Sequence, residues 1–293
     1  MADNNQNKNP QRTQEKKISK PRIQIPDDIA YFLEYEDCSK FNTERYYVME
    51  DIAHLLDTIK ARKKVGDKIR AYGIDFINTT MFYGETGTGK TTAAKYIAHE
   101  LGLDFFYVNF AKLIEGGMGG TAKNICKIFE FVAGVECLFM LDEIDCVAVR
   151  RSTANGANSG EMIRITITIM QELDHLKATN TNSVIIGASN REDMLDEALL
   201  SRFAVKYAIK QISIYDKQNY IKRFINNINK QAKANGEPLV DLDEGNLHYY
   251  ITNTADITMR GIESDIITAL SAWIENGCED FYLEHISSGL QAI

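Results

Sequence analysis

The feature that most constrains this chain's fold is a run of nine residues that spells G-x-x-x-x-G-K-T-T. Glycines at these spacings let backbone N–H groups turn inward and cradle phosphate oxygens. A strand-like run, residues 79–83, precedes the loop and a helix-forming run follows it, so a helix N-terminus would add positive potential there. The predicted phosphate-binding residues are Gly84, Glu85, Thr86, Gly87, Thr88, Gly89, Lys90, Thr91 and Thr92.

Two side chains of this loop have distinct predicted roles. Lys90 is expected to reach the β- and γ-phosphates of a nucleotide, and the Thr91 hydroxyl is expected to be a ligand of Mg²⁺. The alternative interpretation is a glycine-rich turn that joins a strand to a helix and binds nothing.

A second segment supplies the acids that a phosphate site needs. Residues 138–141 are all apolar, and Asp142 and Glu143 follow them directly. A buried strand that ends this way places Asp142 near Mg²⁺, while Glu143 can polarise a water for attack on the γ-phosphate. Taken alone, acids after an apolar run usually mark the solvated end of a strand. Downstream of a phosphate loop, we interpret them as a hydrolytic pair rather than as part of a small-molecule kinase.

Strand and helix patterns alternate along most of the chain. Short apolar runs predict strands, and apolar residues at three- and four-residue spacing predict helices between them. Because the strands are apolar on both faces and joined by helices, we expect a mostly parallel sheet covered on both sides. The predicted strands are 81–83, 105–108, 138–141, 184–186 and 205–209, and the predicted helices are 46–70, 90–101, 122–132, 162–176, 194–200, 217–232, 246–252 and 260–274.

Three domains are predicted from these patterns. Residues 1–28 form a basic N-terminal tail without a packed structure, since residues 1–22 carry six basic and two acidic side chains and three of the four prolines lie within the first 26 positions. Residues 29–210 form the α/β core with an N-terminal helical segment. Residues 211–293 form a small all-helical domain.

Charge and cysteine content narrow the functional classes. The formal net charge is −8, which argues against non-specific wrapping of nucleic acid, although the basic tail could dock on a partner or only aid solubility. The five cysteines contain no C-x-x-C pair, so neither a disulfide framework nor a zinc ribbon is predicted. No apolar run is long enough to span a bilayer. We therefore expect a cytoplasmic protein without a membrane partner.

The glycine loop and the acidic segment that ends in Asp142 and Glu143, together with residues downstream, resemble the corresponding motifs of the AAA+ ATPases. The resemblance is more narrowly to the classical AAA clade. The resemblance covers about residues 46–285. It implies an α/β P-loop NTPase with a five-stranded parallel sheet flanked by helices, followed by a helical lid domain. It also implies ATP and Mg²⁺ as cofactors and assembly into a homo-oligomeric ring, which we expect to be a hexamer.

The same resemblance assigns further site residues. Asn190 matches the polar sensor that orients the attacking water, and Arg202 matches the arginine finger that reaches the neighbouring subunit. Arg260 is similar to the lid residue that touches the γ-phosphate, and Gly73 with Ile74 fits the position beside the adenine by spacing. Read in isolation, Asn190 is a turn former, while Arg202 and Arg260 are surface residues. The chain has one arginine where classical members have two.

Family precedent places a pore loop at residues 111–121, with Met118 at its tip. Threading remodellers usually carry an aromatic residue there, whereas Met118 is flexible and lies in a glycine-rich run, so it could equally be a surface loop without grip. The run is locally similar to the loop of green-lineage Rubisco activases.

Together these expectations describe an ATPase ring that remodels a protein partner. The alternatives are a nucleic-acid motor or loader that uses the basic tail, and a nucleotide-switched scaffold with negligible turnover.

Overall fold

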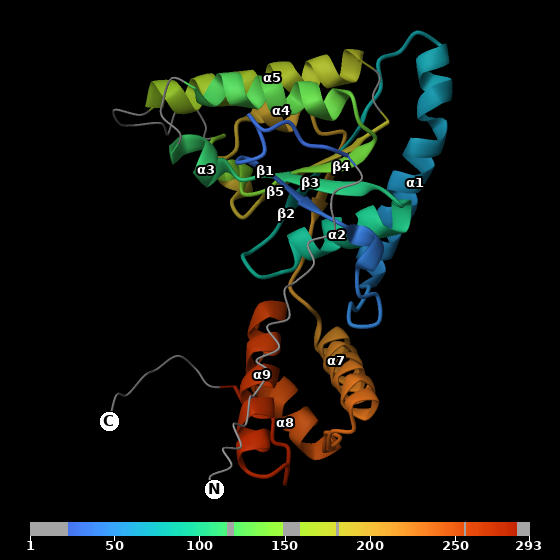
Figure 1. The fold of residues 1–293 in the computed structure, drawn as a ribbon, viewed down its shortest axis with the longest axis vertical. Helices are drawn as coiled ribbons and strands as arrows, with labels where there is room; N and C mark the ends of the chain where they lie inside the picture. Colours follow the sequence, from blue (N-terminus) through green and yellow to red (C-terminus); the bar gives the residue numbers. More distant parts are fainter. Residues whose placement is uncertain (1–22, 116–119, 149–158, 180–181, 255, 286–293) are drawn as a thin grey trace, which may run out of the picture.

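The computed structural model describes residues 23–115, 120–148, 159–179, 182–254 and 256–285. Strands and helices alternate along the first part of the chain, and helices alone follow (Figure 1). The strands are β1 (Leu33–Glu36), β2 (Asn78–Tyr83), β3 (Asp104–Val108), β4 (Cys137–Leu141), β5 (Val184–Ser189) and β6 (Val205–Ala208). The α-helices are α1 (Glu50–Ala71), α2 (Lys90–Leu101), α3 (Phe110–Glu115), α4 (Thr121–Ala133), α5 (Ser159–Ala178), α6 (Glu197–Leu200), α7 (Ile214–Asn235), α8 (Glu244–Asn253) and α9 (Met259–Glu275). Short 3₁₀ turns are η1 (Cys38–Lys40), η2 (Ile144–Cys146) and η3 (Glu192–Met194).

The sheet brings the predicted motifs to one edge. Its strand order is β1-β3-β4-β5-β2-β6, and all neighbouring pairs except β1 and β3 are parallel. Because the carboxyl ends of β2, β4 and β5 lie at the same edge, the residues that follow these strands are neighbours in space. These are the glycine loop after Tyr83, the acids after Leu141 and Asn190 after Ser189.

Alternate residues of each strand pack against different helices, as the two-residue period of a strand requires. One cluster joins Met81, Phe106 and Phe139 to α4 and α5. The other joins Phe82 and Phe105 to α1 and α2. Figure 1 shows these two helical layers on opposite faces of the sheet.

The predicted α/β fold is confirmed, with all five predicted strands present, but the strand count was wrong. The sheet has a sixth strand, β1, which pairs antiparallel with β3 through Leu33↔Val108 and Tyr35↔Phe106. Only four residues long and rich in acids, β1 gives a weak alternation signal, and its position depends on pairing with residues about 70 positions away. The predicted pore loop, residues 111–121, is not a loop at its start, because residues 111–115 belong to the helix α3.

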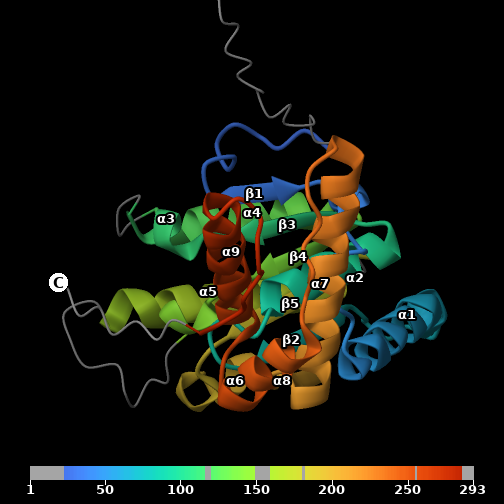
Figure 2. The ribbon, with the colours of Figure 1, turned by 90° about the horizontal axis from the view of Figure 1, so that it is seen from below.

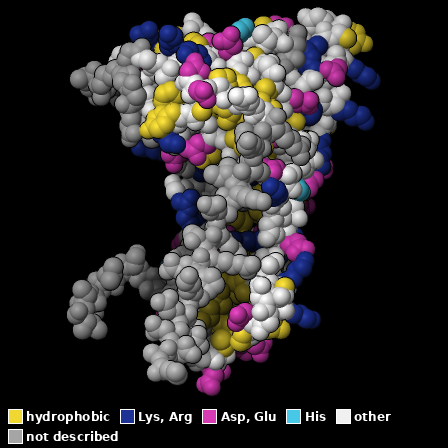
Figure 3. Space-filling view, in the orientation of Figure 1, with side chains coloured by type: hydrophobic (Ala, Val, Ile, Leu, Met, Phe, Trp, Pro, Cys, Tyr) yellow, Lys and Arg dark blue, Asp and Glu magenta, His cyan; other side chains and the backbone are white. Residues whose placement is uncertain are grey.

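The three helices α7, α8 and α9 share a separate apolar core. Tyr220, Phe224, Tyr250 and Trp273 are buried in it, with Ile262 and Ile266. Figure 2, seen from the side of these helices, shows α7 and α9 in front of the sheet, and Figure 3 shows a narrow region between them and the core. These helices lie in the stretch assigned to the lid, and the boundaries of the three predicted domains stay predictions.

No helix in the described ranges is both long and apolar enough to cross a membrane.

Candidate nucleotide-binding site

The loop after β2 adopts backbone angles that favour glycine. Gly84, Gly87 and Gly89 have φ of 149°, 86° and 92°. A Cβ atom at Gly84 would lie 2.4 Å from the carbonyl oxygen of Ile209, and one at Gly87 would lie 2.9 Å from Thr258 Oγ1 in the lid. The glycines therefore permit both the left-handed turns of the loop and its close contact with neighbouring chain.

Lys90, the first residue of α2, turns its ammonium group back into this loop. Its Nζ donates hydrogen bonds to the carbonyl oxygens of Gly84 at 2.7 Å and Glu85 at 2.9 Å, and to Asn190 Oδ1 at 2.6 Å. Burial lowers the pKa of Lys90, while the nearby carboxylates, Asp142 foremost, act in the opposite direction. A cation held in the mouth of a glycine loop, at a helix N-terminus, fits the negative charge of a phosphate chain.

Thr91 and Asp142, the two predicted ligands of Mg²⁺, face each other. The Thr91 hydroxyl donates to Asp142 Oδ2 at 2.7 Å, and Asp142 Oδ1 accepts from the backbone N–H of Glu143 at 2.9 Å. A hydroxyl and a carboxylate are oxygen ligands of the kind that Mg²⁺ prefers, with phosphate and water completing its coordination. Within the described ranges no cluster of three or more His, Cys, Asp or Glu could hold a metal. By the chemistry of their oxygens, Thr91 and Asp142 fit Mg²⁺ delivered with a nucleotide.

Glu143 is exposed and has an unusual backbone for a residue other than glycine. Its φ is 50°, in the left-handed region, and its carbonyl oxygen accepts from the N–H of Cys146 at 2.9 Å. Such a conformation is costly and is often found at functional sites. It directs the chain sharply away at the end of β4, one residue after the acid that pairs with Thr91.

The remaining loop residues form the rim of this site. Thr88 is buried, and its hydroxyl donates to the carbonyl oxygen of Glu85 at 2.9 Å. The Glu85 carboxylate accepts from Gln211 at 2.6 Å, while Thr86 and Thr92 are exposed.

A cavity of about 280 Å³ opens beside the loop. Its walls come from the loop, from the segment before α1 and from the lid. The lining residues are Phe41, Asn42, Arg45, Tyr46, Gly87, Gly89, Thr92, Tyr220, Met259, Arg260 and Glu263. A cavity with aromatic walls beside a phosphate cradle can take the base and ribose of a nucleotide.

Sequence reasoning missed the part of the cavity wall that lies outside the glycine loop, Thr92 and Arg260. Phe41, Asn42, Arg45 and Tyr46 belong to no motif, and Tyr220 and Glu263 look like ordinary helical positions. The only available signal was the cluster of aromatic residues just before α1.

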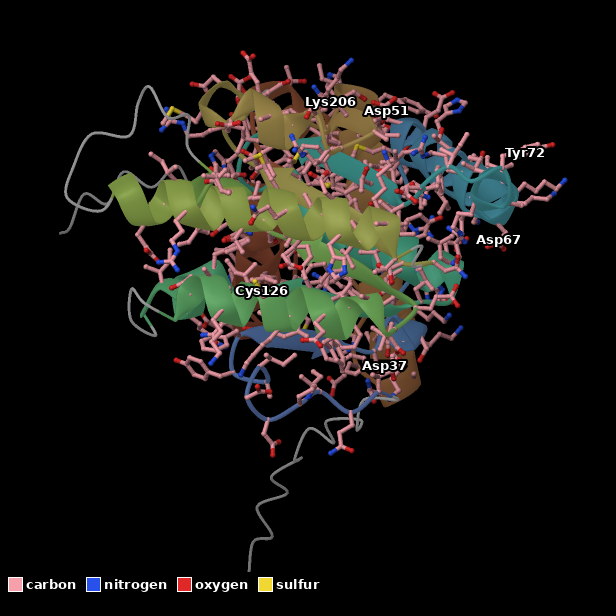
Figure 4. All side chains as sticks on the ribbon, turned by 90° about the horizontal axis from the view of Figure 1, so that it is seen from above. Asp37, Asp51, Asp67, Tyr72, Cys126 and Lys206 are labelled. Carbon is pink, nitrogen blue, oxygen red and sulfur yellow. The ribbon has the colours of Figure 1, made fainter. Side chains whose placement is uncertain are left out.

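The prediction for Gly73 and Ile74 is corrected by the structure. They follow α1 and precede the start of β2, so they lie toward the edge of the sheet opposite the glycine loop. Ile74 is exposed and neither residue lines the cavity. Figure 4 shows the neighbouring Tyr72 at the outer end of α1, pointing away from the core. The spacing failed because α1 is 22 residues long and carries the chain away from the site.

Arg202 also lies far from the glycine loop of its own chain. Its backbone oxygen accepts from Thr79 Oγ1 at 3.0 Å, near the start of β2, and the glycine loop begins only after Tyr83. Four residues of strand span about 13 Å. The guanidinium pairs with Asp174 at 3.0 Å and donates to the carbonyl oxygen of Ala198 at 2.7 Å.

Of the two remaining predicted residues, Arg260 and Met118, the structure describes only Arg260. Arg260 is exposed on the first turn of α9 and lines the cavity with Gly87. Met118, the predicted tip of the pore loop, lies outside the described residues.

A mostly parallel sheet, a glycine loop that leads from β2 into a helix, an inward lysine and an acid at the end of β4, two strands away in the sheet, define a P-loop NTPase. Residues 80–211 match the model of the ATPase family associated with various cellular activities, AAA. This part of the chain is therefore an AAA+ ATPase domain.

The similar proteins are also described as ATPases. The chain is 32% identical over 195 residues to the uncharacterized AAA family ATPase y4kL of Sinorhizobium fredii. The matched segment covers 66% of this chain and 57% of that protein. It is 37% identical over 147 residues to the peroxisomal ATPase PEX6 of Eremothecium gossypii, covering 50% of this chain and 14% of that protein. PEX6 of Komagataella pastoris is 33% identical over 195 residues, 65% of this chain and 16% of that protein. The chain thus spans little more than half of one relative and about a seventh of the others.

Proposed function

We propose that this protein binds ATP with Mg²⁺ and hydrolyses it, and that an oligomeric ring of its subunits uses the hydrolysis to remodel a protein partner. The observation that carries the proposal is the meeting of Lys90, Asn190, Thr91 and Asp142 at the ends of three neighbouring strands. Each of these side chains has the chemistry that a nucleotide and its metal require.

In this proposal each residue performs one task. Lys90 binds the β- and γ-phosphates, and Thr91 and Asp142 hold the metal. When bound, Mg²⁺ supplies charge neutralisation on the phosphate oxygens. Glu143 accepts a proton from the attacking water, and Asn190 orients that water by a hydrogen bond.

A ring, which we propose to be hexameric, is supported by the position of Arg202. In one chain Arg202 is at the opposite edge of the sheet from Lys90, so Arg202 could stabilise a γ-phosphate only in a neighbouring subunit, whereas Arg260 lines the cavity of its own chain. The relatives that are described as ATPases, together with the match to AAA, support action on a macromolecule. We propose that a protein client is contacted through the loop around Met118.

We also propose a cytoplasmic location. All five cysteines are free thiols, as a reducing compartment favours.

Two substitutions test the proposed chemistry separately. Lys90→Ala should lose nucleotide affinity, because it removes the charge that neutralises phosphate. Glu143→Gln should bind ATP but lower kcat by at least about 100-fold, because it removes the general base. Nucleotide binding measured by calorimetry and phosphate release together decide the outcome, and equal loss of binding in both variants would contradict the assigned roles.

The same Glu143→Gln protein can identify the partner class. Held in its ATP-bound state, it should retain a protein client during affinity capture, whereas Lys90→Ala should not. Stimulation of wild-type hydrolysis by DNA, with a steep dependence on salt, would instead support a nucleic-acid motor.

A further inference from the structure

Residues 41–47, here named the strap, connect the core to the lid beside the cavity. On the core side, the ring of Tyr46 packs against Tyr96 of α2 at 4.9 Å between centroids, and Phe41 packs against Tyr46 at 5.5 Å. Just before the strap, the carbonyl oxygen of Cys38 lies 2.8 Å from His99 Nδ1. The strap is therefore seated on the helix that begins at the phosphate loop.

The other side of the strap is held by α7 of the lid. Arg223 donates to the carbonyl oxygens of Thr43 at 2.6 Å and Glu44 at 2.7 Å. The hydroxyl of Tyr47 donates to Asp216 Oδ1 at 2.7 Å. These bonds join residues separated by about 170 to 180 positions in the sequence, so they depend on how the lid sits against the core.

Inside the cavity one residue of the strap meets α9. Arg45 Nη2 lies 3.4 Å from Glu263 Oε1, and the same oxygen accepts from the Tyr220 hydroxyl at 2.6 Å. The Arg45 guanidinium also lies 4.4 Å from the centre of the Phe224 ring. Glu263 follows Arg260 by three residues, nearly one helical turn, so this cluster fixes the part of α9 that carries Arg260.

We propose that Arg45, Glu263 and Tyr220 form a latch that couples nucleotide binding to the position of the lid. The inference rests on the proposed function, since it takes the cavity as the nucleotide site. A nucleotide that fills the cavity contacts strap, phosphate loop and lid together, and it therefore binds the latched arrangement more tightly than an open one. By linkage, the latch raises nucleotide affinity and the nucleotide stabilises the latch by the same factor.

Arg45 acts in this scheme as a positioning residue. It holds α9 through Glu263 and has no role in phosphate chemistry. The side chains of Arg45 and Glu263 are 46% and 38% exposed, so the pair is worth little more than a surface ion pair in water. We therefore expect effects of about 3- to 10-fold on affinity, the range that about 0.7 to 1.4 kcal/mol produces.

A double-mutant cycle tests the latch. Binding of a non-hydrolysable ATP analogue is measured by calorimetry for wild type, Arg45→Ala, Glu263→Ala and the double variant. Each single variant should weaken binding about 3- to 10-fold, and the double variant should be no weaker than the worse single one, because the pair acts as a unit. Arg45→Lys, which keeps the charge, should recover part of the affinity.

A second readout follows the lid directly. Amide hydrogen exchange in α9 should slow when the analogue is added to wild type, and this protection should shrink in Arg45→Ala. The matched control is the ion pair between Lys222 of α7 and Glu244 of α8, whose Nζ and Oε1 atoms are 2.7 Å apart. Neither residue lines the cavity. Lys222→Ala and Glu244→Ala should leave both analogue affinity and α9 protection unchanged.

The outcomes separate the latch from the proposed function. Strictly additive losses in the cycle, or α9 protection that is equal in wild type and Arg45→Ala, would overturn the latch while leaving ATP binding intact. A wild-type protein that fails to bind the analogue would instead overturn the proposed function itself.

Discussion

At the scale of single residues, Glu34 shows how a carboxylate on the edge strand β1 is stabilised by several donors. Hydrogen bonds from the Tyr107 hydroxyl and from Lys112 lower the pKa of its carboxyl to about 2, and Asn109 adds a third donor. These partners lie on β3, just after it and on α3, so the carboxylate ties the edge strand β1 to the base of the predicted pore loop.

We expect Glu34→Gln to lower the free energy of unfolding by about 1 kcal/mol at pH 7, after allowing for partial exposure of the side chain. The carboxyl has a depressed pKa in the folded state, so its contribution is present above its ordinary value of 4.5 and is lost as the pH falls toward about 2. The difference between the two proteins should therefore close over that window.

Urea unfolding at several pH values measures this. Glu136→Gln, which removes a more exposed carboxylate paired with Lys63, serves as the control and should show a smaller difference. A difference for Glu34→Gln that is as large at pH 3 as at pH 7 would contradict the explanation.

At the scale of elements, the glycine loop and the end of β6 depend on each other. Gly84, the first residue after β2, packs against the carbonyl oxygen of Ile209. The N–H of Ile209 donates to the carbonyl oxygen of Tyr83 at 2.7 Å. Ile209 begins the segment that leads into α7. The same contact therefore shapes the phosphate loop and the start of the connection to the lid.

Gly84→Ala should disturb both the phosphate loop and the connection to the lid, because the alanine methyl carbon would lie 2.4 Å from the carbonyl oxygen of Ile209. We expect a loss of about 1 to 3 kcal/mol in the free energy of unfolding, together with weaker nucleotide binding. Gly102→Ala is the matched control, since Gly102 has a φ of 65° with nothing within 4 Å of an added Cβ. It should cost stability through its backbone alone and leave nucleotide affinity unchanged, whereas equal effects of the two substitutions would refute the steric argument.

At the scale of the whole molecule, two of the charged groups that we propose to act at the γ-phosphate are at opposite edges of the sheet. Lys90 follows the carboxyl end of β2, while Arg202 packs near its start. A single subunit cannot bring them together without unfolding β2, so the proposed active site requires two subunits.

Arg202→Ala should bind ATP normally but lose about 10³-fold or more in turnover, as arginine fingers contribute in other P-loop enzymes. Mixing it with Lys90→Ala subunits should restore some activity, because each protein supplies the group that the other lacks. Arg191→Ala, which removes an exposed arginine paired with Asp193 at 3.9 Å, should leave turnover unchanged. Full activity of a demonstrably monomeric wild type would exclude the trans role.

The sequence by itself determined the elements that local chemistry specifies. The glycines from Gly84 to Gly89 can only be understood as a tight loop, and the apolar runs predicted all five parallel strands because a two-sided buried strand leaves a continuous signal. Asp142 and Asn190 follow two of those strands directly, and Lys90 and Thr91 follow the glycine loop after a third, so their meeting at one edge of a parallel sheet could be predicted without coordinates.

Only the tertiary structure decided the contacts between distant segments. The strand β1 has four residues and depends on pairing with β3. The cavity combines Arg45 with Glu263, which are more than 200 positions apart, and the length of α1 took Gly73 and Ile74 away from the site. The physical reason is that a motif records the geometry of neighbouring residues, whereas strand pairing and lid position are set by packing free energy summed over the whole chain.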